Sequence, residues 1–303
     1  MYRLFDGKDH AFIYHKYRIP PPEEVKNLIL QYLEKKRGRQ PANPQHIGGE
    51  CSTHQVQIFQ SPTHCDTYMK GQPHVLVVDL GCGTGQLSRV LAPHFQEVVG
   101  IDVSESQLEQ ARAVPGYPNI TYREGSAEEL PVPDGSVDLL TASSAAHWFD
   151  QSRFLAEANR VLKVGGCIAL LDYILSNSRL HYQDCGDRLT HIFKEVKQDL
   201  MPHTSSPVAA SQSKLQDLFT AIPFPDKERI DAIHVNTSIS VRDLTGLIET
   251  WSMFQTFKKK HPQEAEDLLI STQKRLLKEM GAMSLDTEIG HEMEYFCILA
   301  SKP

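Results

Sequence analysis

Short apolar runs and amphipathic stretches alternate through the middle of the chain. Residues 74–80 form a continuous apolar run that ends at glycines, which is typical of a strand buried on both faces. Similar runs predict four more strands, at 97–102, 120–124, 136–143 and 166–173. Helices are predicted between them, at 85–93, 104–113, 127–130 and 153–162. Strands and helices that alternate at these lengths indicate right-handed βαβ units and a parallel sheet.

The two flanks of this region carry other patterns. Three prolines and two glutamates precede apolar residues at helical spacing, which predicts a helix over 22–36. After residue 173 the alternation loosens. Helices are expected at 187–200, 214–222, 241–254 and 262–280, with a strand-like run at 229–240 and a last strand at 292–301.

Residues 37–73 are polar and have no sustained period, so they are interpreted as a flexible insert outside the core, with one short edge strand allowed at 55–59. The insert contains Cys51, His54, His64 and Cys65, which are residue types that bind zinc. Their spacing matches no standard zinc finger. No metal is therefore expected.

Composition narrows the class of protein. The 303 residues carry a formal net charge of −7, which argues against a nucleic-acid surface. The first residues lack the apolar core of a secretory signal, and no apolar stretch reaches the ~18 residues of a membrane span. Six cysteines without a C-x-x-C pair favour reduced thiols in a cytoplasmic protein. The oligomeric state stays open.

A glycine-rich turn follows the first predicted strand. Gly81, Gly83 and Gly85 lie between that strand and a helix, where glycine permits a tight turn and close approach of a ligand to the backbone. Asp79 precedes the turn and Asp102 ends the second strand, where a carboxylate can accept the ribose hydroxyls.

Three kinds of ligand use such a turn: NAD, FAD and S-adenosylmethionine. A dinucleotide fingerprint requires a third glycine, yet Gln86 or Ser88 stands there, depending on which glycine starts the count. Asp79 would also repel a pyrophosphate, whereas it suits a donor that has an ammonium, a sulfonium and no phosphate. The sequence thus favours S-adenosylmethionine, with an NAD-dependent oxidoreductase or a ligand-free turn as alternatives.

The motifs as a set resemble a known family. The turn, Asp102, the stretch 125–128 and the late stretch 162–166 are similar to class I S-adenosylmethionine-dependent methyltransferases of the type-11 group. This resemblance implies that Asp79, Gly81 and Gly83 surround the methionine part and that Asp102 holds the ribose. It places Ser126 and Ala127 beside the adenine, and Ser143 and Ser144 on the floor. Val164 departs from the family, which usually has proline there.

A narrower resemblance extends outward from these motifs. Phe5, the stretch 146–149 and the stretch 249–252 look like the trans-aconitate methyltransferase branch, whose members methylate carboxylates of small molecules. The resemblance implies that Tyr14, Tyr17 and Arg18 close over the donor. It also implies that Trp251 and Ser252 help to wall the acceptor pocket beside Trp148.

For several of these residues the sequence leaves alternative roles open. His147 follows the fourth strand, where it acts as a base on a hydroxyl or amine acceptor, or only as pocket wall beside Trp148. Arg18 pairs with a carboxylate of the donor or of the acceptor, or is solvated. Tyr14 and Tyr17 either stack on the donor or pack. Trp251 either walls the pocket or is buried in a helical core.

We therefore expect an α/β, Rossmann-like, doubly wound sheet of seven mostly parallel strands with helices on both faces, its last strand antiparallel by family resemblance. An N-terminal helical cap (1–36) precedes the insert (37–73), a donor-binding core (74–173), and a helical cover with the last strands (174–303). The expected activity is methyl transfer to a small molecule, with no nucleic acid or membrane as partner. A non-catalytic binding or scaffolding protein on the same fold is the rival hypothesis.

Overall fold

The computed structural model describes residues 5, 7–37, 74–208 and 213–303. Residues 38–73 of the predicted insert lie outside this part, and so do the strand predicted at 55–59 and the four residues Cys51, His54, His64 and Cys65.

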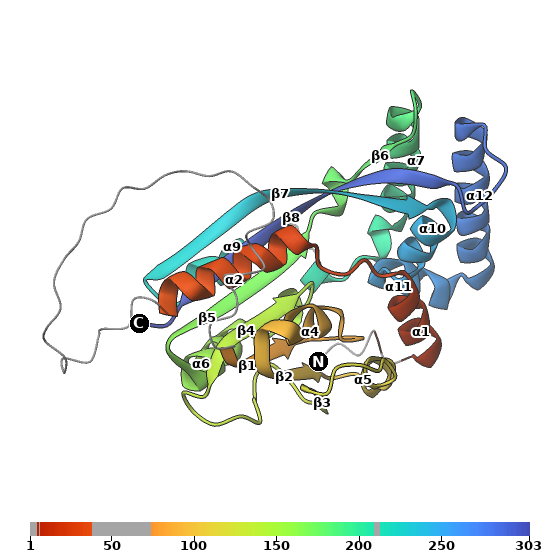
Figure 1. Ribbon diagram of the computed structural model, residues 1–303. Helices are drawn as coiled ribbons and strands as arrows, with labels where there is room; N and C mark the ends of the chain where they lie inside the picture. The colour runs from red at the N-terminus through yellow and green to blue at the C-terminus, as the bar shows by residue number, and fades with distance from the viewer. Residues whose placement is uncertain (1–4, 6, 38–73, 209–212) are drawn as a thin grey trace, which may run out of the picture.

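A mixed sheet forms the centre of the molecule (Figure 1). Five neighbouring strands are parallel and have the order β3-β2-β1-β4-β5. Their bounds are β1 His74–Leu80, β2 Phe95–Asp102, β3 Ile120–Glu124, β4 Val137–Ser143 and β5 Leu162–Tyr173. The last strand, β8 (Glu288–Ser301), lies antiparallel beside β5. The Rossmann-like α/β class that the sequence predicts is confirmed.

Helices cover both faces of the sheet because successive residues of each strand point to opposite sides. On β4, for example, Leu139 packs in one apolar cluster and Leu140 in the other. The first face is covered by α2 (Glu23–Arg37) and α4 (Gln86–Leu91). The second is covered by α6 (Gln151–Val161) and α9 (Gln216–Ala221). The helix α5 (Glu105–Arg112) packs beside β2 and β3.

A helical cover lies at one end of the sheet. Long strands β7 (Asp226–Ser240) and β8 pair antiparallel and run beyond the parallel strands toward this cover (Figure 1). A third apolar cluster joins their ends to the helices of the cover, which are α7 Gly186–Leu200, α10 Val241–Glu249, α11 Ser252–Lys260 and α12 Pro262–Met280. The helix α1 (Lys8–Tyr17) packs against α10 and α5.

Several predicted elements differ in the structure. Within the described residues the sheet has eight strands and not seven, because the three-residue β6 (Arg179–His181) adds to β8. Its sequence is too short and polar to be recognised. The predicted helix at 127–130 is a turn, closed by a bridge between Ser126 and Glu129. The predicted helix at 241–254 is two helices, because Trp251 takes an extended conformation. Finally, α2 packs on the sheet and is no part of a cap.

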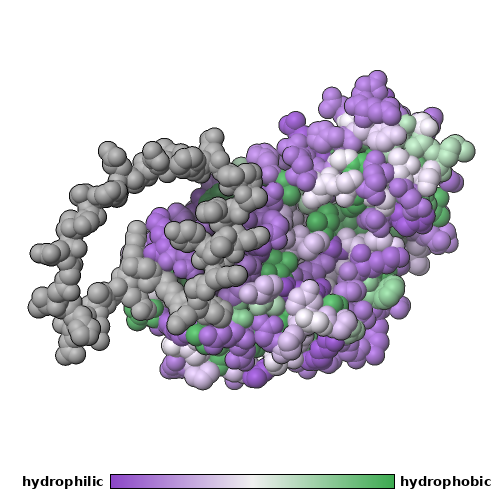
Figure 2. Space-filling model, viewed as in Figure 1, coloured by the Kyte–Doolittle hydropathy of each residue, from purple (hydrophilic) through white to green (hydrophobic). Residues whose placement is uncertain are grey.

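The surface carries no single apolar face in the view of Figure 2, where hydrophobic residues are scattered among hydrophilic ones. Within the described ranges, no helix combines the length and the apolar character that crossing a membrane requires.

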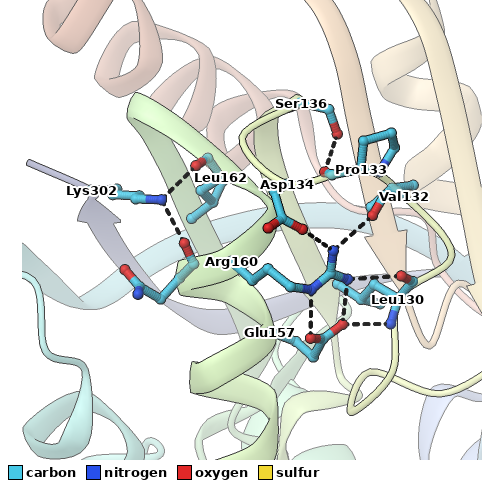
Figure 3. Close-up of polar contacts among 10 residues, drawn as sticks. Leu130, Val132, Pro133, Asp134, Ser136, Glu157, Arg160, Leu162 and Lys302 are labelled. Carbon is cyan, nitrogen blue, oxygen red and sulfur yellow. Dashed lines mark hydrogen bonds and ion pairs between the residues drawn. The ribbon is translucent and has the colours of Figure 1, made fainter.

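Arg160, on α6, holds the loop before β4 in place (Figure 3). Its guanidinium donates to the carbonyls of Leu130 and Val132, at 2.9 and 3.0 Å. It also pairs with Glu157 and Asp134, both at 2.7 Å. These contacts raise the pKa of Arg160, the hydrogen bond to Glu157 being the largest cause. One side chain therefore satisfies polar groups of a loop that has little regular structure.

The substitution Arg160→Ala is expected to lower the free energy of unfolding by about 1–3 kcal/mol, since it removes charge-assisted bonds to two backbone carbonyls. Denaturant unfolding measures the effect. Arg153→Ala is the matched control, because Arg153 is exposed on the same helix, and it should change stability by less than about 0.5 kcal/mol. Equal stabilities of the two variants would show that the loop does not depend on Arg160.

Candidate active site

The carboxyl ends of β1, β2, β4 and β5 meet at one edge of the sheet, where open α/β sheets bind ligands. Three adjoining cavities lie there, and Tyr14 and Ser144 line all of them. The first measures about 110 Å³ and has Asp102, Gln107 and Trp148 in its wall. The second (about 40 Å³) contains Asp79 and Arg18. The third (about 90 Å³) contains Arg18, His147 and Trp251.

The glycine turn between β1 and α4 exposes its backbone to the first cavity. Gly81 has φ +60° and Gly83 has φ +53°, a region that side chains rarely adopt. A Cβ at Gly81 would lie 2.4 Å from the Cβ of Ala145. A Cβ at Gly83 would instead make ordinary van der Waals contact with Tyr14 and Gln107, at 3.7 and 3.6 Å. The turn thus leaves room for a ligand in contact with the backbone.

Two carboxylates flank this turn. Asp79 is 1% exposed and accepts hydrogen bonds from Ser88 Oγ (2.6 Å) and Thr141 Oγ1 (3.0 Å). Burial raises the pKa of Asp79 to about 6. Asp102 accepts from the backbone N–H of Gly83 (2.8 Å) and of Ser104 (2.9 Å) and lines the first cavity. Acids at both strand ends disfavour a pyrophosphate and suit a cationic donor with ribose hydroxyls.

His147 faces a carboxylate in the third cavity. Its Nδ1 lies 3.5 Å from Asp172 Oδ2, and the two side chains are only 8% and 7% exposed. The other oxygen of Asp172 accepts from Ser144 Oγ at 2.6 Å. Ser144 has φ +51°, an unusual conformation for a residue that is not glycine. Asp172 on β5 is thus bound by the residue that directly follows β4.

Arg18 lines both the second cavity and the third. Its Nη1 donates to the hydroxyl of Tyr173, and its guanidinium lies over the ring of Tyr14 at 4.8 Å. The Nε atom is buried and has no hydrogen-bond partner among the described residues. The guanidinium is therefore held in place while its buried Nε donor stays unpaired within the described residues.

The family model described as "Methyltransferase domain" matches residues 78–170, which contain the glycine turn, both carboxylates beside it and His147. The chain is a class I S-adenosylmethionine-dependent methyltransferase. S-adenosylmethionine is its methyl donor.

Relatives support this assignment. A protein of Dictyostelium discoideum, provisionally described as a methyltransferase, is 27% identical over 228 residues, which are 75% of this chain and 80% of that protein. The uncharacterized methyltransferase YcgJ of Bacillus subtilis is 37% identical over 101 residues, 32% of this chain and 40% of YcgJ. A solved structure from Anaeromyxobacter dehalogenans, provisionally described as a type II methyltransferase, has a TM-score of 0.61 at 25% identity and covers 75% of this chain and 90% of its own.

Most residues predicted to bind the donor come together in the methyltransferase. Those that line the first cavity are Tyr14, Gly81, Gly83, Asp102, Ala127 and Ser143. Asp79 lines the second cavity. The acceptor residues predicted from the narrower resemblance, His147, Trp148, Trp251 and Ser252, line the third together with Arg18. Their roles stay predictions, as does the trans-aconitate branch.

Three predicted donor residues lie elsewhere. Gly85 belongs to none of the three linings; a Cβ there would lie 2.1 Å from the hydroxyl of Tyr122, so its smallness serves packing. Ser126 sits in the tight turn that its bridge to Glu129 closes. Tyr17 packs on Gly246 of α10, where a Cβ would lie 2.4 Å from the ring, and so anchors α1 to the cover.

Sequence reasoning missed other residues of the site. Gln107 and Ser104 line the first cavity, and Ser104 is also the N-cap of α5. Asp172 lies within the apolar run of the fifth strand and gave no signal except that an acid is unusual there. Tyr173 follows it and binds Arg18.

Because we expect Asp79 to lie beside the ammonium group of the donor, its raised pKa predicts that donor binding depends on pH. Below about pH 6 the free protein holds a proton on Asp79, while a bound ammonium group favours the carboxylate. Binding should then release a proton, so affinity for S-adenosylhomocysteine rises with pH and levels off above about 6. Calorimetry at pH 5 and 7.5, in buffers of different ionisation enthalpy, should detect up to about a tenfold gain per pH unit. Asp79→Asn should lose this dependence, and equal affinities of the wild type at both pH values would contradict the coupling.

Proposed function

We propose that the methyltransferase acts on a small molecule bound in the third cavity and that the group methylated is a carboxylate held by Arg18 and Trp251. One observation carries the proposal: Arg18 and Trp251 both line this small cavity, and each has a buried donor, Nε and Nε1 respectively, without a partner among the described residues. Leaving such donors unpaired costs about 1–3 kcal/mol each. A carboxylate, which only accepts hydrogen bonds, would satisfy both.

The chain's own residues would bind and orient the acceptor. Bound S-adenosylmethionine supplies an electrophilic methyl group with a good leaving group. An ionised carboxylate needs no base, so positioning by Arg18 and exclusion of water by Trp148 and Phe5 would account for much of the rate. His147 would then be a wall or a hydrogen-bond donor.

A second candidate rests on the pair of His147 and Asp172. A carboxylate beside a histidine orients the ring and stabilises its protonated form, which is the arrangement of a general base. The acceptor would then be a phenol, amine or thiol that must lose a proton.

Two variants and an acceptor panel test the first candidate. With labelled donor and a panel of small carboxylic acids, phenols and amines, the wild type should label the acids. Arg18→Ala should lower kcat/KM by a factor that corresponds to about 2–4 kcal/mol of transition-state stabilisation. For Trp251→Phe the corresponding loss should be about 1–3 kcal/mol. Affinity for S-adenosylhomocysteine and the unfolding temperature are measured for both variants, because Arg18 also borders the second cavity and Trp251 is 2% exposed. An Arg18→Ala enzyme with full rate and unchanged donor affinity would exclude the carboxylate proposal.

A further inference from the structure

Gln107 occupies the capping-box position of α5, three residues after the N-cap Ser104. In a capping box the side chain of Ser104 accepts from the backbone N–H of Gln107, and the Gln107 amide reaches back to the N–H of Ser104. The structure has the first contact, at 3.4 Å. The second is absent from the described contacts, since the N–H of Ser104 donates to Asp102 Oδ1 at 2.9 Å. Asp102 thus takes the partner that the Gln107 amide would have used.

The side-chain amide of Gln107 is buried and has no hydrogen-bond partner among the described residues. Gln107 is 2% exposed, and neither Oε1 nor Nε2 has a hydrogen-bond partner in the part of the chain that the structure describes. A buried primary amide without partners is costly and rare in native proteins. It therefore indicates a ligand that offers both a hydrogen-bond donor and an acceptor.

The position of the amide limits which part of a ligand it meets. Gln107 lines the first cavity together with Asp102 and Ser104. Its Oε1 lies 3.6 Å from where a Cβ on Gly83 would stand, in the gap that separates Gln107 from Tyr14. The N–H of Gly83 itself binds Asp102. Amide and carboxylate thus face the same corner of the cavity.

We propose that Gln107 binds the ribose of the methyl donor together with Asp102 and makes the site selective for ribonucleosides. A hydroxyl both donates and accepts, which is what an unpaired amide requires. Asp102 only accepts, so a ribose hydroxyl that donates to Asp102 can accept from Gln107 Nε2, while its neighbour donates to Oε1. Selectivity against a deoxynucleoside follows, because the amide would be left unpaired in that complex.

The test measures binding in the absence of any acceptor, so it is independent of the proposed carboxylate chemistry. Affinities of wild type and Gln107→Leu are compared by calorimetry for S-adenosylhomocysteine and for its 2′,3′-dideoxy analogue. Gln107→Leu should weaken the natural ligand about tenfold to a hundredfold and the dideoxy analogue about threefold or less. Gln110→Leu is the matched control, because Gln110 lies one turn further along α5 and borders none of the cavities. It should bind both ligands as the wild type does.

Stability separates a binding role from a structural one. Replacing an unpaired buried amide by leucine should leave the unfolding temperature of the ligand-free protein unchanged or raised. Three results would overturn the proposal: wild-type affinity of Gln107→Leu for S-adenosylhomocysteine, an equal loss for both ligands, or a clear fall in the unfolding temperature without ligand.

Discussion

Gly81→Ala should weaken binding of S-adenosylhomocysteine by more than about a hundredfold, the largest effect we expect of a single methyl group in this protein. The new Cβ would lie 2.4 Å from the Cβ of Ala145, a separation that real side chains do not show. Neither partner is the end of a flexible side chain, so the turn and the segment after β4 must move apart. Both line the first cavity, and calorimetry reports the loss directly.

A control variant isolates the free-energy cost of placing alanine at a positive φ. Gly135→Ala places alanine at nearly the same φ (+58° against +60°), but no atom lies within 4 Å of the new Cβ. It should lose about 1–2 kcal/mol of stability and keep its donor affinity. If Gly81→Ala binds the ligand as tightly as Gly135→Ala does, close contact at the turn is not what forms the donor site.

The parallel core could be predicted from the sequence because each strand is specified by its own residues. The third strand was expected at 120–124 and is found there, between turn residues that mark both ends. The bounds of elements that depend on partners could not be predicted, as for the helix within the expected N-terminal cap. The helix α1 is mostly polar, and it is fixed by contacts of His10 with Thr250 and of Tyr17 with Gly246, residues more than 200 positions away.

The same limit applies to the site: residues whose place follows from one strand could be predicted, and residues that depend on contacts between distant segments could not. Asp79 and Asp102 could be found because strand ends have a known place in this fold. Spacing could not separate Tyr14 from Tyr17, which are three residues apart, although one reaches the cavities and the other packs on α10. Asp172 acquires its role only when β4 and β5 pair and bring His147 within 3.5 Å. Such a contact depends on register and on one unusual backbone angle at Ser144, and neither is visible in the sequence.

His147→Gln should separate the two acceptor classes. If the acceptor loses a proton, His147 is the base, and its replacement should lower kcat by about a hundredfold or more. Wild-type activity should then rise with pH, because only the neutral ring can accept a proton. If the acceptor is a carboxylate, the variant should keep most of its activity, and the wild-type rate should not rise with pH in this way.

Asp172→Asn extends this test to the partner of His147. A base that relies on Asp172 to orient its ring should lose much of its advantage without the carboxylate, so Asp172→Asn should lower kcat as well. Residues that act as a unit are not additive, so the double variant should be about as slow as His147→Gln alone. Binding of S-adenosylhomocysteine and the unfolding temperature are measured for each variant, since Ser144 and Tyr173 also donate to Asp172. Additive losses would mean that the two residues only shape the wall of the cavity, and the carboxylate acceptor would then be the candidate that remains.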